Sequence, residues 1–305
     1  MKSYYDCHAK ASLFSFIFLA LLSACTNPRY IHSPSVHNAA FFKQQGDFKF
    51  SAAGAGNPAK IFSGVSDEKE NYESVAHSLG FDGQVAVAVT DHFLLTGSGM
   101  YRDEKDWFND DDLTNVEQDS KVRYSRYSFD IGAGFYTRMG HSDKVYFNGV
   151  LGVGFGAMSS TDNINPYDAA RFKRYQAHTM KYFLHPSFNF FFNDYLRMSV
   201  APRFSLLKLN NIKTNYTTSE EEILGYDDAR RNTFGLFEPA ILLQTGFKNN
   251  DWLKLDMGFN FSTDPFTTKS NGNDDSPAPD VHTYNVQSRN FLLSLGVSIY
   301  PGRKK

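Results

Sequence analysis

His185 and Ser187 are two residues whose types and spacing could support nucleophilic catalysis. A histidine within hydrogen-bond reach of a serine can act as the general base that activates the hydroxyl. In a β-strand, residues two apart point to the same face, and both of these have the parity of the polar face of their predicted strand. We therefore expect a hydrogen-bonded histidine in the protein interior, and no catalytic residue is assigned.

A larger set of ionisable residues shares that polar parity on the predicted strands. Because an unpaired buried charge is costly, we expect opposite charges in this set to pair across strands and fill the interior. A small polar channel or ligand pocket is the alternative, and no cofactor or metal site is predicted. The set comprises Lys49, Asp130, Lys181, His185, Arg197, Arg203, Glu238, Lys254 and Asp256.

Gly152, Gly154 and Gly156 have a spacing that superficially resembles a phosphate-binding loop. They alternate with apolar residues on one predicted strand, and no helix follows them, so the geometry that would hold an anion is missing. We expect these glycines to face the interior and make room for bulky neighbours.

The strands that position these residues follow from a two-residue hydrophobic period between Gly46 and Pro301. In the last segment, for example, Phe291, Leu293, Leu295, Val297 and Ile299 share one face. About ten such segments are joined by links that alternate between short and long, which is the layout of a transmembrane β-barrel. The short links are Asp91-His92, Gly140 to Lys144, Asn193-Asp194 and Lys248 to Asp251, and the long ones cover about 57–80, 104–123, 161–175, 213–233 and 265–287.

The predicted fold is thus an all-β, antiparallel up-and-down transmembrane barrel of about ten strands over residues 46–305, with short periplasmic turns and long extracellular loops. Eight or twelve strands remain possible, as does a soluble periplasmic β-protein tethered by lipid. Because proline cannot donate to a strand ladder, we expect bulges at Pro186, Pro202 and Pro239. Aromatic residues at strand ends predict one girdle of Phe93, Tyr146, Tyr195, Trp252 and Tyr300, and a second of Tyr101, Trp107, Tyr124 and Phe234.

The N-terminus has the features of a secretory leader. Lys2 and Lys10 precede an apolar run from Ala11 to Leu22, about twelve residues long and too short to span a bilayer. The run ends in Leu22-Ser23-Ala24-Cys25, which resembles the lipobox of bacterial lipoproteins. This resemblance implies a signal peptide over 1–24, lipidation of Cys25 and a lipid in the periplasmic leaflet of the outer membrane. Residues 25–45 are then an irregular lead-in, and both termini are expected on the short-turn side.

Composition narrows the functional classes further. The net charge is −2 for the whole chain, which gives no reason to expect nucleic acid as a partner.

The lead-in from Tyr30 to Pro34 and the entry from Phe41 to Phe50 resemble a broad group of lipoprotein-signalled outer-membrane barrels of Bacteroidetes-type bacteria. This resemblance implies the Gram-negative outer membrane and supports the fold.

Two functions are carried forward. The first is a non-enzymatic structural or interaction subunit of the outer membrane, or a narrow porin-like pore, with other outer-membrane proteins as possible partners. The second is a barrel enzyme acting on lipid or peptide at the membrane surface. Outer-membrane lipid and lipopolysaccharide are expected partners in either case, and acidic loops such as Glu220 to Glu222 are expected to be solvated or bridged to lipopolysaccharide by divalent cations.

Overall fold

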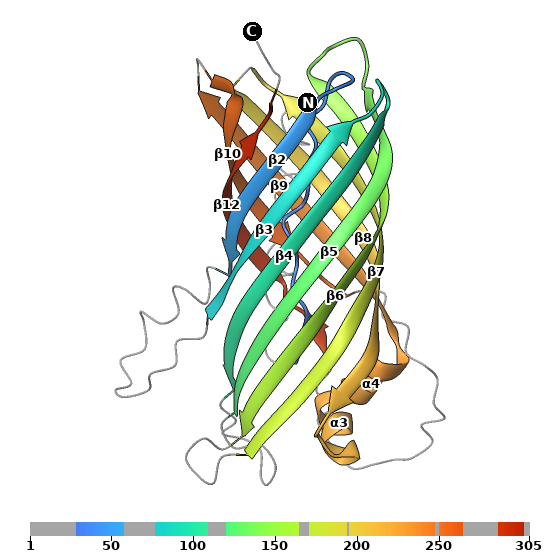
Figure 1. Cartoon of the computed structure of the whole chain (residues 1–305), viewed down its shortest axis with the longest axis vertical. Helices are drawn as coiled ribbons and strands as arrows, with labels where there is room; N and C mark the ends of the chain where they lie inside the picture. The colour runs from blue at the N-terminus through green and yellow to red at the C-terminus, as the bar shows by residue number, and fades with distance from the viewer. Residues whose placement is uncertain are drawn as a thin grey trace, which may run out of the picture.

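The computed structural model describes residues 29–57, 77–108, 120–164, 171–193, 195–247, 250–264 and 286–301. In them, ten antiparallel strands close a barrel in the order β10-β12-β2-β3-β4-β5-β6-β7-β8-β9 (Figure 1). The predicted ten-stranded antiparallel barrel is therefore confirmed. Its strands are β2 (Phe48–Gly56), β3 (His77–Ala88), β4 (Phe93–Phe108), β5 (Ser120–Arg138), β6 (Val145–Ile164), β7 (Arg171–Phe191), β8 (Leu196–Thr214), β9 (Thr233–Phe247), β10 (Asn250–Phe261) and β12 (Phe291–Ile299).

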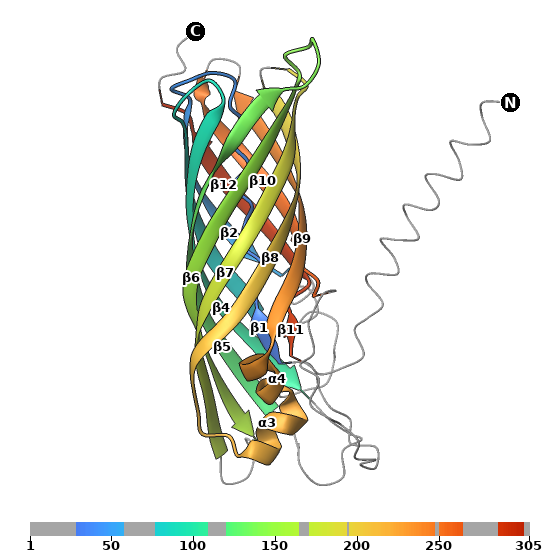
Figure 2. The ribbon, with the colours of Figure 1, turned by 90° about the vertical axis from the view of Figure 1, so that its right-hand side faces the viewer.

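Tight connections gather at one end of the barrel, the short-turn end, and long ones at the other, the long-loop end. The short connections fall at 89–92, 139–144, 192–195 and 248–249, as predicted. At the long-loop end, the link from β8 to β9 contains α3 (Thr218–Leu224) and α4 (Tyr226–Arg231) (Figure 2). Two short strands, β1 (Tyr30–His32) and β11 (Gln287–Ser288), pair in parallel outside the barrel ladder. No helix among the described residues is long and apolar enough to cross a membrane.

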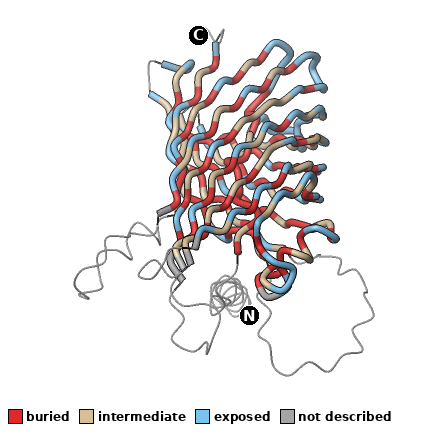
Figure 3. Tube along the Cα trace, turned by 60° about the horizontal axis from the view of Figure 1, so that its bottom comes forward, coloured by how far each residue is buried: buried red, intermediate tan, exposed pale blue. Residues whose placement is uncertain are grey.

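Buried and exposed residues alternate along each strand, as Figure 3 shows. On β5, the outward side chains from Phe135 back to Tyr127 are apolar, and the next ones of the same parity are Ser125 and Arg123. Nine residues at about 3.3 Å rise, tilted by about 40°, give an outer apolar band roughly 23 Å tall. This height is close to the ~25 Å apolar band of a transmembrane barrel.

The barrel is taller on one side than on the other. Strands β4 to β8 are 16 to 21 residues long, and their outer faces turn polar beyond the apolar band. The sequence predicted loops over 104–123, 161–175 and 213–233. This prediction is wrong where the strands extend into these ranges, as at residues 104–108. By contrast, β2 and β12 have nine residues each, and their outward side chains lie within the band. The rim at β10, β12 and β2 therefore stops at the edge of the band.

The three strand prolines do not produce the expected bulges. Leu184 pairs with Phe204 and Phe188 with Val200, so the β7–β8 register is the same on both sides of Pro186. In β8 and β9, Pro202 faces Pro239 within an unbroken register. Two prolines that face each other lack donors on the same rung, so the strands stay aligned and the parity beyond them is unchanged. The register shifts lie elsewhere, between Gln176 and His178 and between Asn250 and Lys254.

The predicted aromatic girdles are correct in part. Phe93, Trp252 and Tyr101 are exposed on the outer wall. Four other predicted girdle residues point inward and place their rings in the lumen. These are Tyr146, Tyr300, Tyr124 and Phe234, which are all buried. Tyr195 is half-buried, and the side chain of Trp107 lies outside the described residues.

The segment before β2 runs through the barrel lumen. It starts with Arg29 at the long-loop end and reaches the short-turn end, where Gly46 hydrogen-bonds to Ala88 just before β2 (Figures 1 and 2). The expectation that this lead-in stays at the short-turn side is therefore wrong for its first part, from Arg29 to Asn38, and holds for Phe41 to Gln45. Residues 1–24, with the predicted signal peptide, and Cys25 lie outside the described residues.

Candidate functional site

Residues 29–42, which we call the plug, occupy the centre of the barrel in an extended conformation. All are buried except Tyr30 and Asn38, which are half-buried. A chain of this kind has few backbone partners of its own, and buried backbone groups need partners. Lumen side chains supply them: the Val36 N–H donates to Asp82 (3.0 Å), and Gln84 donates to the Val36 carbonyl (2.7 Å).

Contacts to the plug come from all ten strands. Hydrogen bonds or ring contacts involve nine of them, through Lys49, Asp82, Arg102, Arg126, Asp162, Phe191, Arg203, Glu238 and Asn260. The tenth, β12, contributes Leu292, which shares an apolar cluster with Val36. Near the short-turn end, Phe41 meets Phe191 edge-on at 5.8 Å between centroids, and Phe42 meets Tyr136 at 6.2 Å.

A central charge cluster surrounds the middle of the plug and consists of Asp130, Lys181, Arg203 and Glu238. Arg203 donates twice to Glu238, at 2.9 and 2.7 Å, and Lys181 donates to Asp130 at 2.8 Å. The plug joins the cluster through His32, 3.0 Å from Glu238, and Ser35, which accepts from Arg203 at 3.1 Å. Two cations thus face two anions across strands; the sequence predicted such pairing for the lumen set as a whole and named no particular pairs.

An outer charge cluster lies nearer the long-loop end and comprises Asp82, Arg102, Glu104, Asp106, Arg126 and Arg289. Glu104 pairs with Arg126 and with Arg289 (2.8 Å), and also accepts from Ser33 of the plug (3.0 Å). Asp106 pairs with Arg289 and Asp82 with Arg102, both at 2.6 Å. This cluster was not predicted from the sequence, because residues 104–123 were expected to form a loop. A sequence feature could have identified part of it: Arg102, Glu104 and Asp106 have the same even-numbered parity as Met100, which is buried.

The remaining predicted residues lie apart from these clusters. Lys49 donates to the Ala39 carbonyl at 2.9 Å, and Asp256 accepts from Gln244 at 2.8 Å. Arg197 stacks over the Tyr300 ring at 5.4 Å, and Lys254 is buried. The nine predicted residues are therefore all on the lumen side, Asp256 half-buried, but they form several groups along the barrel.

His185 faces the lumen, with its ring edge-on to His37 of the plug at 4.9 Å between centroids. Ser187 is buried on the same face. Both residues thus have the lumen parity expected from the sequence, and they lie inside the barrel wall. The expected hydrogen bond is not seen at Nε2 of His185, which is buried without a hydrogen-bond partner among the described residues. Within the described part of the chain, no three His, Cys, Asp or Glu side chains are placed to bind a metal ion.

Two small cavities lie beside the plug among the described residues. One lumen cavity of about 20 Å³ lies beside Ile31 and His32, and another of about 10 Å³ lies beside Val36. A buried water needs about 10–15 Å³, so each cavity holds about one water molecule. The arrangement provides ion pairs and packing where an open pore would have a continuous column of water.

Helices α3 and α4 lie at the long-loop mouth of the lumen (Figure 2). Tyr226 stacks on Tyr175 at 4.1 Å between centroids and lies 3.3 Å from the Ser160 hydroxyl. It belongs to a buried cluster that includes Ile31 of the plug. Burial raises the pKa of Tyr226 to about 12, so the hydroxyl stays protonated at neutral pH. Helix α3 is fixed by a capping box between Thr217 and Glu220.

The lumen glycines make room for neighbouring groups, as expected. A Cβ atom at Gly152 would overlap the Phe183 ring and the Ile131 carbonyl oxygen. We expect Gly152→Ala to lower the free energy of unfolding by about 1–3 kcal/mol, the usual cost of overpacking. Heat-modifiable gel migration measures this shift. Gly83→Ala is the matched control, because a Cβ atom at Gly83 would have no neighbouring atom within 4 Å, and equal losses in both variants would contradict the packing argument.

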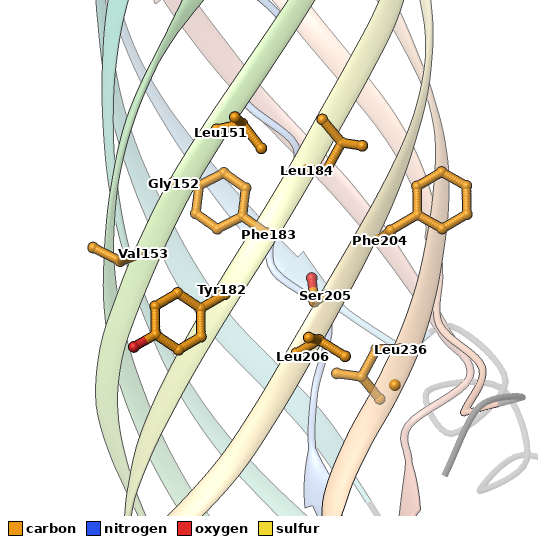
Figure 4. A pocket seen from close by; sticks show the side chains of 11 residues that line it. Leu151, Gly152, Val153, Tyr182, Phe183, Leu184, Phe204, Ser205, Leu206 and Leu236 are labelled. Atoms are coloured by element: carbon orange, nitrogen blue, oxygen red, sulfur yellow. The ribbon is translucent and has the colours of Figure 1, made fainter. Parts of the chain in front are cut away.

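A groove of about 710 Å³ lies on the outer wall across β6 to β9 (Figure 4). Its exposed side chains are Leu151, Tyr182, Leu184, Phe204 and Leu206. The Ser205 hydroxyl, which also borders it, already donates to Glu238 inside the lumen. The groove is part of the outer apolar band, and its other side-chain polar group is the Tyr182 hydroxyl, which donates to Met180 Sδ at 3.9 Å.

Comparisons with known proteins give only remote structural similarity. No family model matches the chain, and no curated protein matches it. The fold is similar to the outer membrane protease OmpT from Escherichia coli, with a TM-score of 0.42, 8% identity, and coverage of 87% of this chain and 100% of that one. It is also similar to the translocator domain of autotransporter NalP from Neisseria meningitidis, with a TM-score of 0.41, 10% identity, and coverage of 97% and 98%.

Proposed function

We propose that this protein is an outer-membrane β-barrel lipoprotein of a Gram-negative bacterium, with its long loops outside the cell and Cys25 lipidated. The outer apolar band supports a membrane location, because its height fits the hydrocarbon layer and a closed barrel leaves no unpaired strand edge in lipid. The polar outer faces of β4 to β8 beyond the band are suited to water on the long-loop side.

The protein acts as a closed structural or interaction subunit, and it does not conduct ions. The observation that carries this proposal is the plug, whose 14 residues are nearly all buried and contact every strand of the barrel. Among the described residues, ion pairs occupy the lumen around the plug, and the two cavities beside it are too small for a solute. The groups available to a partner are then the long loops, the cap formed by α3 and α4, and the outer wall.

Planar bilayer recording of the purified full-length protein tests the closed state. We expect no stepwise current above the bilayer leak, because the lumen cavities beside the plug hold about one water each. A purification in mild detergent, followed by identification of co-purifying proteins, tests the interaction role. Stable single-channel openings in the unmodified protein would favour the narrow pore and overturn the closed barrel.

A further inference from the structure

The first described residue is fixed at the long-loop end of the barrel. Arg29 donates to Asp162 at 2.9 Å, and both side chains are buried. Asp162 also accepts from the Tyr216 hydroxyl at 3.0 Å, close to the cap. The chain before Arg29 therefore starts from the mouth that the long loops surround.

Backbone pairing fixes the direction of the chain at this mouth. Strand β1 pairs in parallel with β11: the Gln287 N–H donates to the Arg29 carbonyl, and the Arg289 N–H donates to the His32 carbonyl, both at 2.9 Å. Arg126 donates to the Tyr30 carbonyl from the opposite wall. These contacts on two sides of β1 hold it in one direction, in which the chain enters at the long-loop mouth and runs inward.

The distance along the chain decides which membrane face Cys25 can reach. Three residues, Thr26 to Pro28, separate Cys25 from Arg29, so the four chain steps from Cys25 to Arg29 span at most about 14 Å when fully extended. On β6, Asp162 lies five residues beyond Ala157, the last apolar outward position, which corresponds to a height of about 13 Å above the band. The short-turn edge of the band, at Phe147, is roughly 38 Å away by the same geometry.

The low rim gives the chain a path back to the membrane surface. Arg29 pairs with Gln287, which is four positions before Phe291, the first residue of β12. The outward side chains of β12 lie within the apolar band, so in the described part of the chain the wall on this side ends at the band's edge.

From this placement we propose that the lipid on Cys25 enters the outer leaflet, on the same face of the membrane as the long loops. This proposal rests on the proposed function, which supplies the lipid on Cys25. The side of the membrane is inferred from the position of the plug. It replaces the periplasmic leaflet expected from the sequence, because the four chain steps from Cys25 to Arg29 cannot cross the membrane while the plug stays in the lumen.

Cysteine labelling on intact cells tests the side of the membrane. We would place Asn27→Cys in the full-length chain and treat cells with a membrane-impermeant maleimide. Ser219→Cys in α3 and Ser142→Cys in the 139–144 turn are the matched controls, since both positions are exposed at opposite ends. Asn27→Cys is expected to label on intact cells to the same extent as Ser219→Cys, while Ser142→Cys labels only after the outer membrane is permeabilised.

Lipidation is measured separately, so the two proposals can fail independently. Incorporation of an alkyne-labelled palmitate should be seen in the unmodified chain and lost in Cys25→Ser. Palmitate incorporation with Asn27→Cys labelled only after permeabilisation would overturn the outer-leaflet placement and leave the lipoprotein intact. Absence of palmitate would overturn the lipid anchor, and the leaflet proposal with it.

Discussion

Deletion of residues 29–42 is expected to turn the closed barrel into an ion-conducting one. The deletion removes the plug and leaves the turn at 43–47 that leads into β2. Water then enters a lumen lined by Asp82, Glu104 and Asp162, whose plug partners Val36, Ser33 and Arg29 are gone. Planar bilayer recording should show stepwise currents that the unmodified protein lacks.

The same deletion should lower thermal stability strongly. Removing one partner of a buried pair costs about 3–5 kcal/mol, and a loss of about 5 kcal/mol corresponds to a fall in Tm of about 10–20 °C. Heat-modifiable migration measures this shift. Addition of a synthetic peptide covering residues 29–45 should suppress the current, and a scrambled peptide should not. A deletion variant that folds, as judged by its migration, yet carries no current would contradict the account of the closed lumen.

Glu238→Ala is expected to be the most destabilising single substitution in the lumen. Glu238 is fully buried and accepts from Arg203 twice, from Ser205 at 2.7 Å, and lies 3.0 Å from His32. Its loss leaves the Arg203 guanidinium without its main partner in the interior, so the free energy of unfolding should fall by about 3–5 kcal/mol. Denaturant unfolding in detergent, followed by gel migration, measures the change.

Asp103→Ala provides the control for that substitution. Asp103 forms a 2.6 Å pair with Arg123 on the outer face, where both side chains are accessible to water. Exposed pairs contribute about 0–1 kcal/mol, so this variant should be nearly as stable as the unmodified protein. The double variant with Glu238→Ala and Arg203→Ala should lose less than the sum of the single losses, because the two residues are directly coupled. Equal losses for Asp103→Ala and Glu238→Ala would show that burial does not set the cost.

Alternation predicts the barrel wall well, because lipid on one side and a polar lumen on the other impose a two-residue period. That period places Asp130, Arg203 and Glu238 on the lumen face, where all three are buried. It fails where β4 leaves the band, since Asp103 and Lys105 face water while Arg102 and Glu104 face the lumen. When both faces of a strand carry charged residues, no two-residue hydrophobic period develops, and the sequence of the strand resembles that of a loop.

The plug could not be derived from local sequence patterns. An extended segment that contacts strands on all sides has no single buried face, so neither a two-residue nor a helical period develops. Its residues are of mixed type, from Ser33 and Ala40 to Phe41 and Phe42, and Pro34 fits an irregular lead-in equally well. Tyr146 and Tyr300 were assigned to the girdle for a related reason: an aromatic ring with a polar tip suits a membrane interface, and only the three-dimensional structure shows that both rings are buried inside the barrel.

Thiol accessibility of Ser35→Cys tests the central claim most directly. Serine to cysteine is nearly isosteric, and Ser35 is buried beside Arg203 in the middle of the plug. In the folded protein in detergent, a water-soluble methanethiosulfonate should modify this cysteine at least about a thousandfold more slowly than Ser219→Cys in α3, which corresponds to an opening free energy of about 4 kcal/mol. Modification of both cysteines at equal rates would mean that residues 29–42 do not fill the lumen.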